Sequence, residues 1–317
     1  MVGTKHLTIK MKKNYHLCYT SHREVMYRCE EDMNVAINCM CSALCRTDSA
    51  CYAYSFMSDH HHGGYRTDCP GELIRIKRDS YTKYFNNKYL RKGKLGEEGF
   101  YLQEIEGARH FVAAVAYIVK NPSHHGVTSI PFEYPFSSAN AYFRKELGKM
   151  RTEKPLSYEQ IRRSLPRRAL FEASWKMGTD DVFWPETVLD VIAVETNFGT
   201  VQAFNYYMGR KSGEDWRAEQ ERDGNTIPPF TLENMEKPLL SVSELTIAEL
   251  LRNEKSRFST VPITDLDLCR IIDTEYVKRF RKRTVYELTL QEKNQIANEL
   301  IACFRAGRAQ LIRCLVI

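Results

Sequence analysis

Alternating apolar and polar positions predict several strands in the first half of the chain. Such patterns cover residues 14–20, 50–57 and 99–105, and the second of these is rich in aromatic residues. The second strand leads directly into the stretch SDHHHGG, whose three consecutive histidines we take as part of a further strand. These segments are spaced closely enough for antiparallel pairing.

Helical spacing of apolar residues alternates with these strands. A helix is predicted from about residue 30 to 46, and a basic amphipathic helix is predicted to begin at Pro70 and to end before Lys92. A third covers residues 107–121, where Pro122 is expected to stop it. The order strand, helix, strand, strand, helix, strand, helix predicts an α+β domain with helices packed on a mostly antiparallel sheet.

The composition changes after about residue 145, where turn formers and mixed charges suggest a linker. We therefore expect one domain over residues 1–147 and a mostly helical region over 148–317. Within the latter, residues 290–315 hold two apolar groups separated by Gly307. They predict either a DNA-binding helix-turn-helix, with basic residues 277–283 touching phosphates, or a helical hairpin packed on its own domain.

Composition narrows the class of protein. Hydrophobic residues make up 43% of the chain, and the longest apolar run is the nine residues FVAAVAYIV, so no membrane span is expected. The first residues lack the apolar core of a secretory signal, so we expect a cytoplasmic protein with reduced cysteines. The densest cysteine group lacks paired C-x2-C spacing, which favours small buried hydrophobes over a zinc site. This group comprises Cys39, Cys41, Cys45 and Cys51.

Positive charge is concentrated in the first half. Residues 1–150 contain 21 basic and 15 acidic side chains, which leaves 25 of each for the remainder, and residues 66–94 alone contain nine basic and three acidic ones. Basic groups neutralise phosphates and aromatic rings stack on unpaired bases, so this segment predicts a face that binds single-stranded DNA. An ordinary solvated helix face is the alternative. The candidate DNA-binding residues are Arg75, Lys77, Arg78, Lys83, Lys88, Arg91, Lys92 and Tyr84.

The three histidines have a second interpretation besides a surface tract. Successive side chains on a strand face opposite sides, so His60 and His62 share one face and His61 lies on the other. Two imidazoles at this spacing form half of a site for a divalent metal.

Tyr117 stands out on the helix that follows. The apolar stripe of the helix predicted over residues 107–121 contains Phe111, Val115 and Ile118. Tyr117 points almost directly away from this stripe, and Asn121 lies one turn later on the same side as Tyr117. A phenol is a poor nucleophile at neutral pH unless its target is activated. A metal held by the two histidines would activate a phosphodiester for attack by Tyr117, and Asn121 would add an oxygen ligand. An ordinary exposed tyrosine is the alternative.

Four ordered motifs within residues 15–143 resemble a known family. They are similar to motifs of the single-tyrosine HUH endonucleases and, within these, of the REP-associated tyrosine transposases. The four motifs are YAYSFMSDHHHGG, YTKYFNNKYLRKGKL, AVAYIVKNPSHHGV and YPFSSANAYF. The last two motifs are the most specific. The resemblance covers less than half of the chain.

The resemblance implies a fold, a site and a reaction. The fold would be a ferredoxin-like or RRM-like antiparallel sheet with the histidines on a central strand. His60, His62 and Asn121 match the metal ligands, for Mg²⁺ or Mn²⁺, and Tyr117 matches the nucleophile. The substrate would be single-stranded DNA near a hairpin, which is nicked and rejoined through a 5′-phosphotyrosine during DNA transposition or recombination.

Two departures from the family pattern bear on this expectation. His61 stands where a bulky apolar residue is usual, so it must be buried neutral or paired. Glu97 and Glu98 stand where polar or basic residues would lie near DNA. The hypotheses are therefore a transposase or nicking enzyme or, as the alternative, a catalytically weak or inactive hairpin-binding regulator of the same fold. Whether it acts as a monomer or a homodimer stays open.

Overall fold

The computed structural model describes residues 11–21, 23–209 and 263–317. Its centre is a four-stranded sheet in the order β2-β3-β1-β4, in which every neighbouring pair is antiparallel. The α+β class expected from the sequence is confirmed. The strands are β1 (Lys13–Thr20), β2 (Ala50–Phe56), β3 (His60–Thr67) and β4 (Tyr101–Glu104).

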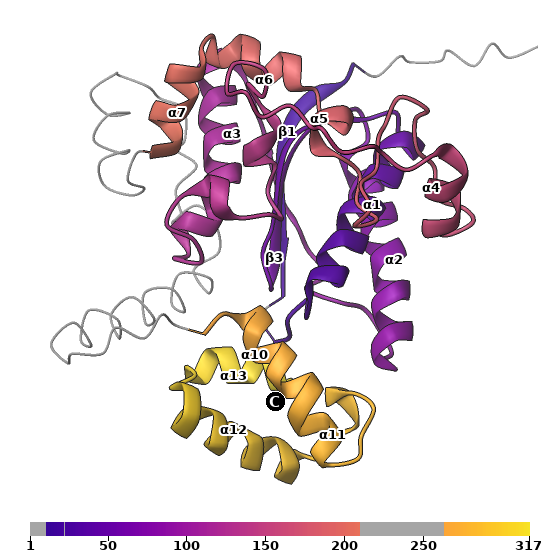
Figure 1. Ribbon diagram of the computed structural model, residues 1–317, viewed down its shortest axis with the longest axis vertical. Coiled ribbons are helices and arrows are strands. Elements are labelled where there is room, and N and C mark those ends of the chain that lie inside the picture. The colour runs from indigo at the N-terminus through magenta and orange to yellow at the C-terminus, as the bar shows by residue number, and fades with distance from the viewer. Residues whose placement is uncertain (1–10, 22, 210–262) are drawn as a thin grey trace, which may run out of the picture.

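Helices cover both faces of this sheet. In Figure 1, α1 (Glu30–Arg46) and α2 (Pro70–Tyr89) lie on one side of the strands and α3 (Gly107–His124) lies on the other. Every residue of α3 from His110 to Pro122 is buried, because the sheet covers one side of this helix and later helices cover the other. The sheet is therefore the middle layer of three, and β1 and β3 are its central strands.

The third helix does not stop where the sequence predicted. It continues through Pro122 to His124, because a proline removes only its own backbone donor. The bonds from His125 N to Asn121 O and from Val127 N to Pro122 O complete the last turn. The extra turn brings His124 and His125 beside the face of the sheet that carries His60.

Residues 148–209 pack on the same hydrophobic core as the sheet. Ile161, Phe183 and Phe204 are at most 3% exposed and belong to the cluster that contains Leu17 of β1. The expected domain boundary after residue 147 therefore does not coincide with the end of the core, because the apolar side chains that follow are buried against the first part. The helices of this segment are α4 (Tyr158–Ser164), α5 (Pro185–Val188), α6 (Val191–Phe198) and α7 (Val201–Gly209).

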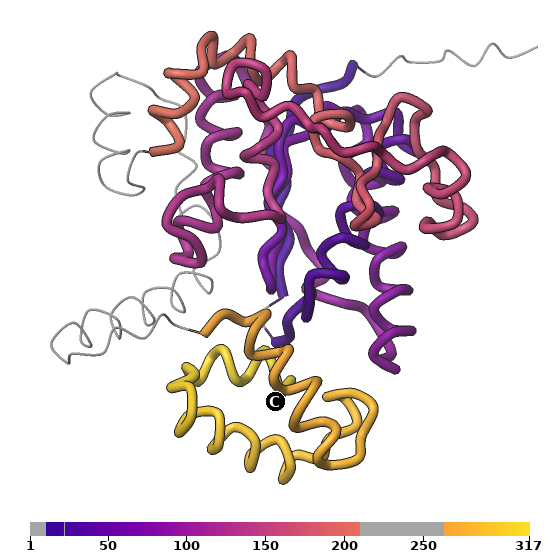
Figure 2. The backbone as a smooth tube through the Cα atoms, in the orientation of Figure 1, coloured from indigo at the N-terminus to yellow at the C-terminus, as the bar shows by residue number. Residues whose placement is uncertain are grey.

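A second core lies in residues 263–317, which we call the C-terminal unit. Its buried apolar side chains include Leu268, Ile272, Ile296, Leu300 and Leu311. Figures 1 and 2 show this unit beyond one end of the sheet. Its helices are α10 (Asp265–Ile271), a π-helical turn (Ile272–Tyr276), α11 (Val277–Arg279), α12 (Leu290–Phe304) and α13 (Arg308–Leu315).

The predicted pair of helices at 290–315 is present as α12 and α13, with Gly307 just before the second. Four of the eight residues of α13 are buried, including Arg313 and Leu315. A helix that reads a DNA groove must present its side chains outward. The packing of α13 therefore fits the hairpin alternative better than the helix-turn-helix.

Among the described residues no helix is both long enough and apolar enough to cross a membrane. All ten cysteines are free thiols, and Cys41 and Cys51 are buried. Burial raises the pKa of the Cys41 thiol well above its ordinary value. Cys41 and Cys51 thus behave as small core residues, as expected, whereas Cys39 and Cys45 of the same group are partly buried.

Candidate active site

The histidines of β3 divide between the two faces of the sheet. His60 and His62 lie opposite Thr20 and Cys18 of β1 and face α3. His61 faces the other way, where its ring lies 4.2 Å from that of Phe56 and 5.4 Å from that of Tyr19. All three are at most 1% exposed, so the tract is not the surface feature that the sequence left open.

Helix α3 brings Tyr117 and Asn121 to the face that holds His60 and His62. The ring centroids of Tyr117 and His62 are 5.5 Å apart. Asn121 Oδ1 lies 2.7 Å from His60 Nε2. The structure thus places together all four residues that the sequence singled out for chemistry. Tyr117 is 6% exposed, so it is not the ordinary exposed tyrosine that the sequence left as an alternative.

Asp59 determines how His60 presents its nitrogens. Asp59 Oδ1 lies 2.7 Å from His60 Nδ1, and a carboxylate only accepts, so Nδ1 carries the proton. In the neutral ring, Nε2 then points a lone pair toward the Asn121 oxygen, which also carries lone pairs. The two atoms repel each other at this distance unless a proton or a cation lies between them. Carboxylate, histidine and metal are arranged in this way in many metal sites.

The Asp59 carboxylate is itself held ionised. Burial would raise its pKa, but Arg313 and His60 outweigh burial and hold that pKa well below its usual range. Arg313 Nε of α13 lies 3.3 Å from Asp59 Oδ2. Asp59 is therefore a charged acceptor, and its charge is balanced from the C-terminal unit.

His62 is neutral and lies among other imidazoles. Its Nδ1 is 3.1 Å from His16 Nε2, and the two rings stack with centroids 5.3 Å apart. Burial, followed by repulsion from His60 and His16, puts the pKa of His62 well below its ordinary value. Burial and repulsion from His110 lower the pKa of His16 to about 3. The neutral form of an imidazole is the one that binds metals.

Tyr117 is enclosed by rings. The centroids of His16, His62 and His124 lie 5.8, 5.5 and 5.4 Å from its own. Burial is the main reason why the pKa of its phenol lies above the ordinary value; Cys18 and Tyr101 add to the rise and a hydrogen bond with Asn121 opposes it. The phenol is thus protonated at neutral pH, and its use as a nucleophile requires an activated target.

The residues around Tyr117 and His60 fit a divalent cation only in part. His60, His62 and Asn121 supply two imidazole nitrogens and an amide oxygen, and Asp59 supports the first of them. Within residues 11–21, 23–209 and 263–317, no three His, Cys, Asp or Glu side chains are grouped to hold a metal ion. A metal here would therefore need the Asn121 oxygen and ligands from substrate or water, as Mg²⁺ commonly does.

Sequence reasoning missed several residues of this site. Asp59 directly precedes the histidines, and His124 and His125 follow Pro122, so nearness to the chosen motifs was a signal for these three. His16 lies on the same face as Cys18, which strand alternation could have shown. Arg313 carried no such signal, because only tertiary packing brings it to Asp59.

The basic residues of the expected DNA-binding face do not all reach the surface. Arg75, Lys83 and Lys92 are exposed. Lys77 is 2% exposed, and its ammonium lies 5.1 Å from the ring centroid of Tyr19 and 4.6 Å from that of Phe56. The assignment of Lys77 to a DNA contact is therefore corrected: this position of α2 faces the sheet, so the side chain is enclosed.

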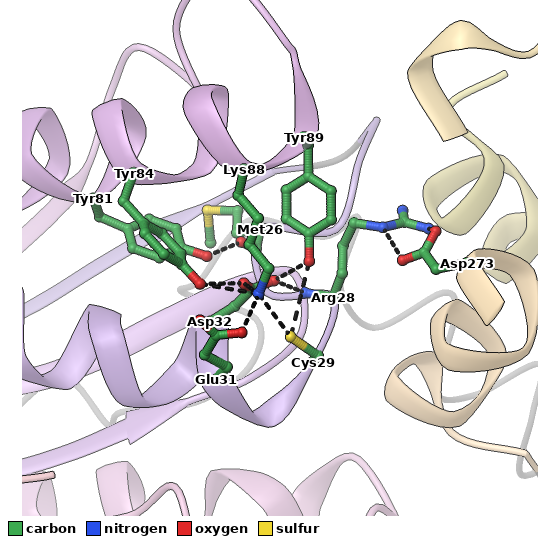
Figure 3. A network of polar contacts seen from close by, with 10 residues as sticks. All are labelled: Met26, Arg28, Cys29, Glu31, Asp32, Tyr81, Tyr84, Lys88, Tyr89 and Asp273. Atoms are coloured by element: carbon green, nitrogen blue, oxygen red, sulfur yellow. Dashed lines mark hydrogen bonds and ion pairs between the residues drawn. The ribbon is translucent and has the colours of Figure 1, made fainter. Parts of the chain in front are cut away.

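Other members of that face bind partners within the protein. Figure 3 shows Lys88 and Tyr84 turned toward Asp32, whose carboxylate lies 2.7 Å from Lys88 Nζ and 3.1 Å from Tyr84 OH. Arg91 Nε donates to Glu24 Oε2 at 2.9 Å. Arg78 donates to backbone carbonyl groups, among them that of Leu95. The side chains of Arg78, Tyr84, Lys88 and Arg91 therefore bind acidic side chains or backbone carbonyl groups within the protein. The basic surface that remains is smaller than the sequence suggested.

Comparisons with known proteins are sparse. No protein-family model matches this chain, and no curated protein matches it either. Among solved structures, that of a REP-associated tyrosine transposase bound to a REP hairpin aligns with a TM-score of 0.37 and 15% sequence identity. The alignment covers 47% of this chain and 87% of that one. A likeness at this level does not establish a common fold.

Proposed function

We propose that this protein is a metal-dependent enzyme of the single-tyrosine HUH type, which nicks single-stranded DNA near hairpins and transfers the strand. One observation carries the proposal: Tyr117 and Asn121 of α3 meet His60 and His62 of β3 on one buried face. The strand order β2-β3-β1-β4, with the histidines on a central strand, supports the ferredoxin-like arrangement that such an enzyme would use.

His60 Nε2, His62 and the Asn121 oxygen are the groups that would hold Mg²⁺ or Mn²⁺. When bound, the metal would polarise a phosphodiester oxygen and offset negative charge as the bond is exchanged. Asp59 accepts from His60 Nδ1, which favours the tautomer whose Nε2 lone pair would bind the metal. Burial keeps His62 neutral for the same purpose.

Tyr117 would act as the nucleophile. Its phenolic oxygen forms a bond to phosphorus while the bond from phosphorus to the 3′-oxygen breaks. The electron pair of the broken bond stays on the 3′-oxygen, and the proton lost by the phenol is balanced by the proton that this oxygen gains through solvent. The products are a 5′-phosphotyrosine and a free 3′-hydroxyl. Attack by another 3′-hydroxyl would reverse the step and join a new strand.

The exposed basic residues of α2 and of the loop after it would bind the DNA backbone. Arg75, Lys83 and Lys92 are exposed at separate points along this segment. Arg75 also pairs with Glu72 and Asp79 on its own helix, so a phosphate would compete with these two carboxylates for it. The enclosed position of Tyr117 requires DNA to displace part of its cover before the reaction.

A denaturing gel tests this proposal. Hairpin-bearing single strands labelled at the 3′ end are incubated with wild type, Tyr117→Phe and Tyr206→Phe, with Mn²⁺ or with EDTA. Tyr206 is 58% exposed on α7 and serves as the control tyrosine. We expect a slow-migrating covalent adduct with Mn²⁺ in wild type and Tyr206→Phe, and none in Tyr117→Phe or with EDTA. Undiminished nicking by Tyr117→Phe would refute the assignment of the nucleophile.

A hairpin-binding protein without catalysis is the second candidate. The observation that favours it is the 6% exposure of Tyr117, because an enclosed phenol is poorly placed to attack a bound strand. Binding that weakens with salt, with no adduct under any metal condition, would identify this function instead.

A further inference from the structure

The C-terminal unit is tied by polar contacts to the loops that flank the candidate site. Val25 N donates to Arg313 O at 3.3 Å. Arg28, which has no exposed side-chain surface, donates to both carboxylate oxygens of Asp273 and to Cys314 O. Figure 3 shows Arg28 extended from its loop toward Asp273 on the neighbouring helix. The unit is thus docked on the segment between β1 and α1.

One of these contacts reaches the candidate site itself. Arg313 of α13 lies between two carboxylates, with Nε 3.3 Å from Asp59 Oδ2 and Nη2 2.9 Å from Asp265 Oδ2. The side chains of Arg313, Asp59 and Asp265 are 9%, 11% and 10% exposed. Ser58 Oγ also donates to Asp265 Oδ2, at 2.8 Å. The turn between β2 and β3 is therefore joined to α10 and α13 through nearly buried charges.

The charges show what Arg313 does there. Asp59 and Asp265 contact the same guanidinium, and two nearly buried carboxylates placed in this way repel each other unless a cation lies between them. Arg313 is that cation, and its planar guanidinium contacts both. Because Asp59 uses its second oxygen to accept from His60 Nδ1 at 2.7 Å, a displaced Asp59 would leave His60 free to turn or to change tautomer.

We infer that Arg313 is a positioning residue of the active centre: through Asp59 it holds His60 in the tautomer and orientation that bind a metal, so that the docked C-terminal unit strengthens metal binding. This inference rests on the proposed function for the role of His60. It gives the C-terminal unit a task at the site that the position of these residues in the sequence does not reveal.

Four variants of the full chain test the inference. Arg313→Gln removes the cation, and Arg313→Lys keeps the charge without the planar contact to both acids. Arg313→Gln combined with Asp265→Asn removes the cation together with one of the two carboxylates, so it keeps the test valid if the single variant does not fold. Arg279→Gln is the matched control, because Arg279 pairs with Glu299 on the exposed surface of the same unit.

Two readouts go beyond folding, which circular dichroism checks. Nitrogen-15 NMR of the histidine rings reports whether His60 carries its proton on Nδ1, with His60→Gln used to assign the signal. Calorimetry with Mn²⁺ alone reports affinity. We expect wild type and Arg279→Gln to keep the Nδ1 proton, and Arg313→Gln and the double variant to lose the single tautomer and to bind Mn²⁺ about 10-fold to 100-fold more weakly. Arg313→Lys should fall between them.

A folded Arg313→Gln, or a folded double variant, that keeps the Nδ1 proton and the wild-type affinity would overturn the inference. The proposed function fails by a different result, the lack of a tyrosine adduct in wild type. The tautomer readout needs neither DNA nor metal, so the two ideas are judged separately.

Discussion

Asn121 Oδ1 of α3 and His60 Nε2 of β3 lie 2.7 Å apart, at the point where the helix crosses the central strands. If both atoms bind one cation, Asn121→Ala should weaken Mn²⁺ binding by about tenfold or more, or about 1.4 kcal/mol for each factor of ten. Asn121→Asp should strengthen it, because a carboxylate is the harder and more charged ligand. Calorimetry with Mn²⁺ measures both effects.

The control for this pair is Asn197→Ala. Asn197 is an exposed asparagine of α6 whose side chain donates to Ala193 O of the same helix. It should leave Mn²⁺ affinity unchanged. Wild-type affinity in Asn121→Ala would show that the amide is not a ligand.

The exposed part of the basic helix makes a separate prediction about DNA. Replacing Arg75, Lys83 and Lys92 by glutamine should weaken binding of single strands and lower the slope of log affinity against log salt by about two, since each phosphate contact contributes about 0.7. Filter binding or fluorescence anisotropy at several salt concentrations measures the slope. An unchanged slope would show that these three residues do not contact the DNA backbone.

Lys88→Gln is the matched comparison on the same helix. Because Lys88 is paired with the buried Asp32, its loss should cost about 1–3 kcal/mol of folding stability, with little change in the salt slope. A large fall in the slope of log affinity against log salt, with unchanged stability, would instead show that Lys88 contacts DNA.

Lys77 should destabilise the fold at neutral pH. Its ammonium has no hydrogen-bond partner in the described part of the chain, and burial lowers its pKa well below the ordinary 10.5. At pH values between the folded and the unfolded pKa, the unfolded chain binds more protons than the folded chain, so stability rises with pH until the unfolded pKa is reached. Lys77→Met should add about 1–3 kcal/mol at pH 7 and less at pH 9.5.

Urea unfolding at the two pH values measures this difference. Lys83→Met is the control, because Lys83 lies on the exposed side of the same helix. A destabilised Lys77→Met would mean that the ammonium has a stabilising role. Lys77→Met should not change DNA affinity, because the side chain of Lys77 is buried against the sheet.

Two neighbouring glycines of β3 should respond differently to alanine. A Cβ on Gly63 would lie 2.3 Å from the hydroxyl of Tyr65, whose ring folds back so that this hydroxyl meets His61 Nε2 at 2.9 Å. A Cβ on Gly64 would come closest to the flexible end of Ile118, at 3.2 Å, with Tyr52 Cβ and Ala53 N at ordinary contact distances of 3.8 and 3.9 Å. Gly63→Ala should therefore cost about 1–3 kcal/mol and Gly64→Ala much less, as measured by thermal or urea unfolding. Equal costs would contradict this account.

The elements of the first half could be predicted because their signals are local. Apolar spacing in residues 30–46 and the alternation in residues 14–20 each depend on one face of a single element, and the structure shows a helix and a strand there. Pro122 misled the prediction because a proline near a helix end costs only one bond, which neighbouring turns replace. The core continues past the boundary expected after residue 147, because a change in composition does not report what a segment packs against.

The candidate site was predictable in part for the same reason. Strand alternation alone places His60 and His62 together, and helical spacing alone places Tyr117 beside Asn121. That the two pairs meet follows from the packing of α3 on β3. Their roles in catalysis and metal binding stay predictions.

By itself, then, the sequence determined the α+β class, the extent of most early helices and strands, and which side chains share a face of each, because periodicity is a property of consecutive residues. Only the tertiary structure decided which basic side chains reach solvent, where the core ends, and that Arg313 balances the charge of Asp59 behind His60. Burial and charge pairing depend on distances between segments far apart in the chain, and no local pattern encodes those distances.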